Sequence, residues 1–173
     1  MIGIILSIFL FSALAITLTE QTMISQPFSA NERQQILDTH NTHRQNVNPP
    51  AKVMSFLIWD AELESIAQKW AENCSGDNIM LPHNPNRSFG YPTYVGENIY
   101  ATSATTADPV AATNAWNAEK VYYDFDSGTC ASGKVCGHYT QEVWSTTTKI
   151  GCGRYEYVFF FFYVFFEFLM ILH

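Results

Sequence analysis

Residues 137–147 read Gly-His-Tyr-Thr-Gln-Glu-Val-Trp-Ser-Thr-Thr, and this stretch decides how the rest of the chain is interpreted. It combines a histidine, a glutamine and two aromatic side chains over a short distance. If the stretch is helical, we expect Glu142 to face solvent, as ionisable side chains usually do. Residues Lys149 to Tyr157 then alternate and include β-prone types, which predicts a strand.

The composition of the whole chain indicates one globular domain. Its 173 residues suffice for a sizeable core, and 47% of them are hydrophobic, so wholesale disorder is not expected. Nine Lys and Arg face sixteen Asp and Glu, which gives a formal net charge of −7. Because an acidic surface repels phosphate backbones, nucleic-acid binding is excluded as a function.

The N-terminal residues predict export. An uncharged apolar run over Ile2 to Ile16 ends near Ala13-Leu14-Ala15, a small-x-small cleavage pattern. We interpret residues 1–19 as a signal peptide cleaved near Ala15–Thr19, and expect a secreted, extracellular protein. The alternative is an uncleaved membrane anchor, although the run is shorter than the roughly 20 residues that a span needs.

Four cysteines follow in the exported part, and an oxidising compartment favours disulfides between them. They are Cys74, Cys130, Cys136 and Cys152. Four cysteines allow three pairings, and the sequence alone does not choose one. Asn73 and Asn86 begin N-glycosylation sequons, which fit the same compartment.

Helix signals precede the 137–147 stretch. Ser29 and Glu32 form a capping-box pattern, which predicts a helix over about 30–46. Asp60 can cap a second helix, and Asp108-Pro109 is a typical start of a third. Between the second and third helices, residues 75–106 are rich in Gly, Pro, Asn, Ser and Thr, which predicts a long loop with short ordered pieces.

The 137–147 stretch resembles the signature G-H-Y-T-Q-x-V-W-x-x-T of the CAP (SCP/TAPS) superfamily, which includes cysteine-rich secretory proteins, insect venom antigens and plant pathogenesis-related proteins. Glu142 departs from it, since the family usually has an aliphatic residue there. Further segments resemble the family in order and spacing, namely Thr39–Arg44, Trp59–Leu63, Gly96–Ile99 and Trp116–Tyr123. The resemblance implies an α+β fold, an α-β-α sandwich around a small antiparallel sheet, with the domain over 29–157.

The resemblance also implies a cleft lined by two histidines and two glutamates. Carried over by motif, these fall on His83, Glu97, Glu119 and His138. Two imidazoles beside two carboxylates suit a divalent cation such as Zn²⁺, and in the family His83 and His138 would be its ligands. The alternative is a hydrogen-bonded network with a purely structural role.

Catalysis is the less favoured interpretation of this cleft. A bound metal could activate water, with Glu97 or Glu119 as general base, which would give a metal-dependent hydrolase or protease. The chain contains no H-E-x-x-H or G-x-S-x-G motif. His40 and His43 lie three apart on the first helix and could also face one another as ligands, but we expect one to support the core and the other to be solvated. We therefore assign no catalytic residue.

Binding is the favoured function. The resemblance implies a lipid or sterol ligand. An apolar groove could be lined by the loop Phe89 to Tyr94, although ordinary loop packing is the favoured interpretation of these aromatic residues. An extracellular protein target, as for a venom-like toxin or an immune effector, is the alternative.

The C-terminal residues break the family pattern. Residues 158–173 are almost all aromatic or aliphatic and carry no Gly, Pro or Asn to signal a hairpin turn. We interpret them as an aberrant tail, out-of-frame or intron-derived, that leaves the sheet without one strand and the fold C-terminally incomplete. A membrane segment and a buried strand are the alternatives, and membrane contact is expected only if the tail is genuine.

The resemblance bears on the disulfides too. It implies a local bridge between Cys130 and Cys136. The usual partners of Cys74 and Cys152 would lie in or just before the replaced segment. Those two are therefore expected to be unpaired or to pair with each other.

Overall fold

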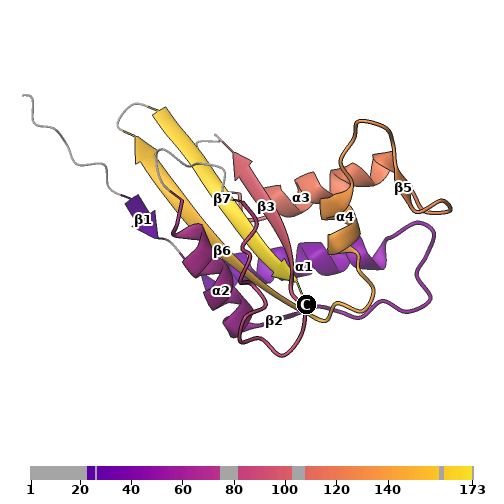
Figure 1. Ribbon diagram of the computed structural model, residues 1–173, viewed down its shortest axis with the longest axis horizontal. Helices are drawn as coiled ribbons and strands as arrows, with labels where there is room; N and C mark the ends of the chain where they lie inside the picture. Colours follow the sequence, from indigo (N-terminus) through magenta and orange to yellow (C-terminus); the bar gives the residue numbers. More distant parts are fainter. Residues whose placement is uncertain (1–22, 26, 75–81, 103–107, 160–161, 173) are drawn as a thin grey trace, which may run out of the picture.

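A five-stranded sheet forms the centre of the molecule (Figure 1). The computed structural model describes residues 23–25, 27–74, 82–102, 108–159 and 162–172, so the signal peptide expected at 1–19 lies outside it. The strand order is β1 (Met23–Ser25), β6 (Lys149–Phe159), β7 (Phe162–Leu172) and β3 (Gly96–Thr102), all antiparallel neighbours. β2 (Ile58–Trp59) pairs with β6 in parallel. A separate two-stranded sheet joins β4 (Tyr123–Asp124) to β5 (Thr129–Cys130).

The first two helices begin where local signals predict. At α1 (Ala30–Gln45), the Ser29 and Glu32 side chains each accept from the other's backbone N–H, which completes the capping box. At α2 (Ala61–Ala71), Oδ1 of Asp60 accepts hydrogen bonds from two first-turn N–H groups.

The third helix starts later than expected. Asp108 Oδ1 accepts from the Val110 N–H in a turn that precedes α3 (Ala111–Ala118). A 3₁₀ turn, η1 (Glu119–Tyr122), continues it, and α4 (Gly137–Glu142) contains most of the 137–147 stretch.

Successive residues of β6 point to opposite faces of the sheet, and each face is covered by one layer of helices. A Cβ added to Gly151 would overlap the backbone of Leu63 and Glu64, and one added to Gly153 would overlap Gln68, so α2 lies directly on this face. Ile150 and Cys152 point the other way, into a core shared with α1 and α3 that includes Ile36 and Trp116. The result is the α-β-α sandwich that the resemblance implied (Figure 1).

The expectation that the residues after β6 leave the sheet without one strand is wrong. β7 pairs with β6 from Ile150↔Leu172 to Phe159↔Phe162 and with β3 on its other edge. The sequence argument failed because it required a turn signal, whereas strand formation here follows from a β-prone run placed between two strands that both need a neighbour.

Two of the four cysteines form a disulfide, and the other two lie on opposite faces of the central sheet. Cys130 and Cys136 form a disulfide. Cys152 lies in the core on the α1 and α3 side, whereas Cys74 packs with Ala71 and Tyr155 on the α2 side. The expected alternative, a bridge between Cys74 and Cys152, is therefore wrong, because the sheet lies between them.

Candidate functional site

Glu97, near the start of β3, binds His83 from the preceding loop. Its Oε1 atom lies 2.6 Å from His83 Nδ1 and accepts a hydrogen bond of 2.9 Å from the Asn84 N–H. The Glu97 carboxylate is buried, while the His83 side chain is 59% exposed. Burial raises the pKa of Glu97 above its ordinary value, although hydrogen bonds from Asn84 and His83 act in the opposite direction.

A second pair joins η1 to α4. Oε1 of Glu119 lies 2.6 Å from Nδ1 of His138, and Oε2 accepts from the N–H groups of His138 and Tyr139 at 3.1 and 3.2 Å. The indole of Trp116 stacks on the His138 imidazole with 6.2 Å between ring centroids. These contacts fix the orientation of His138, whose side chain remains 31% exposed.

The structure thus arranges the four predicted cleft residues as two His–Glu pairs. One residue connects them, since Asn98 follows Glu97 on β3 and its Nδ2 donates to the His138 carbonyl at 2.9 Å. In both pairs the Nδ1 atom contacts a carboxylate, which leaves Nε2 as the nitrogen available to a ligand.

Both pairs share one feature with metal-binding histidines. A carboxylate on Nδ1 is the usual support for a metal-binding imidazole. A catalytic zinc ion, however, normally has three protein ligands. Within the described residues, no group of three or more His, Cys, Asp or Glu side chains is arranged to hold a metal ion. The two histidines could supply two ligands, and the glutamates would orient them.

A third His–Glu pair was not predicted. Glu142, expected to face solvent, is fully buried, and its Oε1 lies 2.7 Å from Nδ1 of His43, whose side chain is 15% exposed. The expectation for Glu142 is wrong because α4 packs its C-terminal end toward α1, so that Glu142 lies on an inner face. One of the two helix histidines was expected to be solvated, and His43 is not. Burial raises the pKa of Glu142, and the nearby His43, Arg44 and Lys120 lower it.

Two further α1 side chains, Arg44 and His40, are also buried. The guanidinium of Arg44 is buried and donates to the carbonyls of Glu142, Trp144, Ser55 and Thr147. His40 lies in the core, as expected for one of the two helix histidines, with Nδ1 2.7 Å from the Ile36 carbonyl. Burial lowers the pKa of His40 to about 3, so the ring is neutral at physiological pH.

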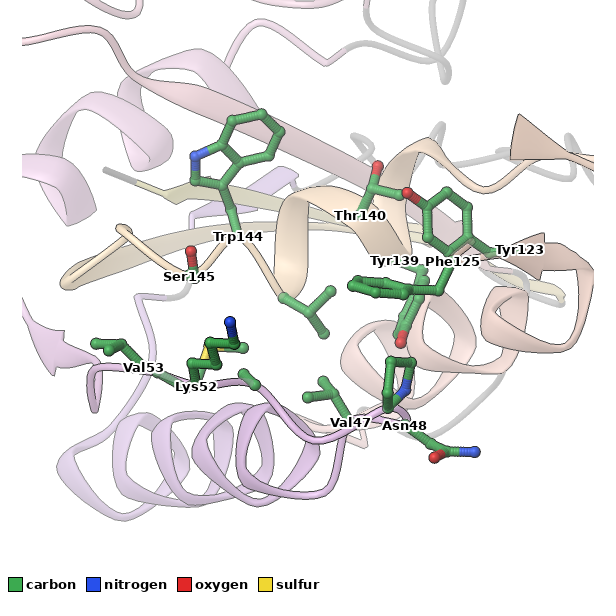
Figure 2. Close-up of a pocket in the computed structure, with 14 residues that line it drawn as sticks. Val47, Asn48, Lys52, Val53, Tyr123, Phe125, Tyr139, Thr140, Trp144 and Ser145 are labelled. Carbon is green, nitrogen blue, oxygen red and sulfur yellow. The ribbon is translucent and has the colours of Figure 1, made fainter. Parts of the chain in front are cut away.

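An apolar pocket of about 570 Å³ lies beside Tyr139. Figure 2 shows its walls, formed by the chain after α1, by the segment at β4 and by α4 with the residues that follow it. The apolar lining residues are Val47, Pro49, Ala51, Val53, Met54, Phe125, Val143 and Trp144, together with the rings of Tyr123 and Tyr139. The loop Phe89 to Tyr94, considered above as one wall of an apolar groove, does not contribute to this pocket. Phe89 is instead 86% exposed.

A smaller and mainly polar cavity of about 330 Å³ adjoins this pocket. The two share Val47, Asn48, Tyr123, Phe125 and Tyr139. The smaller cavity is also lined by His43, Asn46, Asn117 and Lys120. We call the larger cavity the apolar pocket and the smaller one the polar arm.

Comparison with known proteins identifies the family. The model of the cysteine-rich secretory protein family, CAP, matches residues 37–167, which is more than half of the chain. The chain belongs to the CAP family.

The chain matches only part of the curated relatives of this CAP domain. It is 38% identical over 125 residues to peptidase inhibitor 16 from Mus musculus, covering 72% of this chain and 23% of that protein. It is 39% identical over 116 residues to GLIPR1-like protein 1 from Homo sapiens, covering 67% and 47%. Pathogenesis-related protein 1A from Nicotiana tabacum is 37% identical, over 73% and 67%. The chain therefore spans less than half of the first two relatives.

Solved structures agree on the CAP fold. Venom allergen-like protein 4 from Schistosoma mansoni superimposes with a TM-score of 0.59 at 24% identity, covering 82% of this chain and 83% of that one. Na-ASP-1 gives a TM-score of 0.58 at 24% identity, covering 84% and 40%.

Two of the CAP motifs contact each other directly. A Cβ on Gly96, which opens the Gly-Glu-Asn segment of β3, would overlap the side chain of Gln141 in α4. This packing places β3 beside α4, where Asn98 donates to the His138 carbonyl, so the two motifs position the two His–Glu pairs relative to each other.

The remaining surface features bear on the compartment. In the part of the CAP chain that the structure describes, no helix has both the length and the apolar character that crossing a bilayer requires. The sequon residues Asn73 and Asn86 are both exposed, and glycosylation there stays a prediction.

Proposed function

We propose that this chain is an extracellular CAP-domain protein that acts by binding an apolar or amphipathic small molecule, a lipid or a sterol, rather than by catalysis. The observation that carries the proposal is the apolar pocket. Its volume of about 570 Å³ falls in the range of roughly 300–1,000 Å³ typical of small-molecule sites, and aliphatic and aromatic side chains dominate its wall. Secretion, which the family's name implies, is part of the same proposal.

The His–Glu pairs support binding more than turnover. Each glutamate of the predicted cleft engages a histidine Nδ1 atom, which is the position of a carboxylate that orients an imidazole. A hydrolase would require a third protein ligand or a nucleophile beside them. Hydrolysis of peptides or esters that a chelator abolishes would contradict a purely binding role.

Phe125 and Phe89 offer a matched test of the proposed pocket. Both are exposed aromatic residues, at 62% and 86%, but only Phe125 lines the pocket. Titration with the neutral dye Nile red should give saturable fluorescence in the wild type. Phe125→Glu should weaken binding about tenfold, because it places a charge in the apolar wall. Phe89→Glu should bind like the wild type, and equal loss in both variants would refute the pocket assignment.

A metal ion is the second candidate ligand. It is favoured by one observation, that both His83 and His138 have Nδ1 fixed by a glutamate. If a divalent cation binds, Nε2 of these residues would hold it, and the metal would supply Lewis acidity to a coordinated group.

A further inference from the structure

The polar arm differs in chemistry from the apolar pocket and can be considered by itself. Its volume of about 330 Å³ lies at the lower end of the roughly 300–1,000 Å³ of small-molecule sites. Three asparagines line it together with the rings of Tyr123, Phe125 and Tyr139, and His43 and Lys120 add ionisable groups. The wall therefore combines aromatic surface with many hydrogen-bonding groups.

Two buried polar side chains of this wall are left without a partner among the described residues. Asn117 in α3 is 9% exposed and Tyr139 in α4 is 7% exposed, yet neither the amide nor the hydroxyl has a hydrogen-bond partner in the part of the chain that the structure describes. Figure 2 shows the Tyr139 hydroxyl directed toward the chain at Val47 and Asn48, which line the same cavity. Because an unpaired buried polar group costs free energy, nearly all such groups have a partner. Asn117 and Tyr139 are therefore available to a ligand in the polar arm.

His43 adds a hydrogen-bonding group of fixed orientation. Its Nδ1 atom lies 2.7 Å from Oε1 of the buried Glu142, and its side chain is 15% exposed. In a neutral ring whose Nδ1–H donates to the carboxylate, Nε2 is an acceptor. The amides and hydroxyls of the wall both donate and accept, so the polar arm offers a mixed set of partners. Hydroxyl groups, which also donate and accept, match this set better than an anion, which only accepts.

The aromatic rings supply the complementary apolar surface. Tyr123 and Tyr139 meet edge to face with 5.9 Å between ring centroids, and Phe125 lines the same cavity. A pyranose ring has C–H groups on its two faces and hydroxyl groups around its edge. Its faces can therefore pack on aromatic rings while its hydroxyl groups bond to the polar side chains of the wall.

We propose that the polar arm is a saccharide site that holds one pyranose unit, with Asn117, Tyr139 and His43 as its hydrogen-bonding groups. Glu142 is a positioning residue that fixes the His43 ring. The saccharide site is independent of the proposed function, because it concerns another cavity and another class of ligand. It requires no opening between the polar arm and the apolar pocket.

Chemical-shift titration of the ¹⁵N-labelled chain tests the proposed site. The probes are the methyl pyranosides of glucose, galactose, mannose and N-acetylglucosamine, and the corresponding free sugars. We expect at least one probe to give saturable shifts with a Kd of about 1 mM, since a ligand of this size gains limited affinity. Saturation by a methyl pyranoside would support a sugar unit of a glycan, and saturation by a free sugar alone would support a free monosaccharide. No saturable shift with any of these sugars, or saturation by inorganic phosphate alone, would overturn the proposal.

Two conservative replacements locate the bound sugar. Tyr139→Phe removes only the hydroxyl, and Asn117→Leu replaces the amide by an apolar group of similar volume. Each should weaken binding of that sugar about tenfold, because one hydrogen bond to the ligand is lost. The urea midpoint of each variant should equal or exceed that of the wild type, since neither polar group has a partner among the described residues. A purely structural role would lower the midpoint and leave sugar binding unchanged.

Tyr122→Phe and Asn114→Leu are the matched controls. They make the same chemical changes at exposed residues that line neither cavity, so both should bind the sugar like the wild type. Asn117→Leu should also leave the Nile red titration unchanged, because Asn117 does not line the apolar pocket. Wild-type sugar affinity in both Tyr139→Phe and Asn117→Leu, or equal weakening in the controls, would overturn the saccharide site and leave the proposed function intact.

Discussion

The Nδ1 atom of His43 lies 2.7 Å from Oε1 of Glu142, although the two residues are 99 positions apart in the chain. The pair joins the C-terminal half of α1 to the end of α4 in a buried environment. It therefore connects the helix that carries Arg44 to the segment that carries the family signature. Its stability has consequences that can be measured.

Replacing one residue of this pair should lower the free energy of unfolding more than replacing both residues. His43→Leu leaves the buried Glu142 carboxylate without its partner and should lower the free energy of unfolding by about 3 kcal/mol. The double variant His43→Leu/Glu142→Val should lie within about 1 kcal/mol of the wild type, because two apolar side chains of similar volume replace the pair. Urea denaturation of the single and double variants measures the coupling. Additive effects would contradict a direct interaction.

The packing of α2 on β6 should not tolerate a side chain at Gly153. A Cβ there would overlap backbone atoms of Ala67 and Gln68, which cannot move without shifting the helix. Gly153→Ala should cost about 3 kcal/mol or more in urea denaturation. Gly137→Ala is the control, since a Cβ at Gly137 meets nothing within 4 Å. Equal stability of the two variants would show that α2 does not lie as close to the sheet as described.

His40 should make the fold sensitive to acid. Its folded pKa of about 3 lies below the ordinary value of 6.5, so the unfolded chain binds more protons between these values. Stability from this group is present above pH 6.5 and falls as pH decreases through that window, by up to about 1.4 kcal/mol per pH unit. Burial raises the pKa of Glu97 and Glu142 above 4.5. The contribution of these two groups to stability therefore falls as pH increases just above 4.5, opposite to that of His40.

Comparison with a variant separates these contributions. The difference in unfolding free energy between the wild type and His40→Gln should vary with pH between about 3 and 6.5 and be flat above it. A difference that does not vary with pH would mean that His40 is not buried as a neutral ring.

Metal binding at the cleft should be weak and depend on the supporting carboxylates. Calorimetric titration with Zn²⁺ should detect one site that His138→Ala abolishes. Glu119→Gln should weaken it by about 10–100-fold, because the carboxylate orients His138. The control is His43→Ala, which removes a histidine outside the cleft. Heat that persists in His138→Ala would place the metal elsewhere.

Local signals in the sequence predicted local structure well. Ser29 and Asp60 cap their helices as expected, because capping depends on neighbours within one turn. The four residues at the two pairs were predicted only through the family motifs, and their pairing came from the structure. Glu142 was misjudged, since which face of α4 packs on α1 depends on tertiary contacts. β7 was missed for a similar reason, because its pairing partners, not a turn motif, select it.

Direct binding of radiolabelled ligands tests the central claim most directly. Delipidated protein should bind tritiated cholesterol or tritiated palmitate saturably, at about one molecule per chain, and Phe125→Glu should lose this binding while Phe89→Glu retains it. Non-saturable uptake of both ligands by the wild type, or equal binding by the two variants, would contradict the account that this CAP domain is a carrier with its ligand in the apolar pocket.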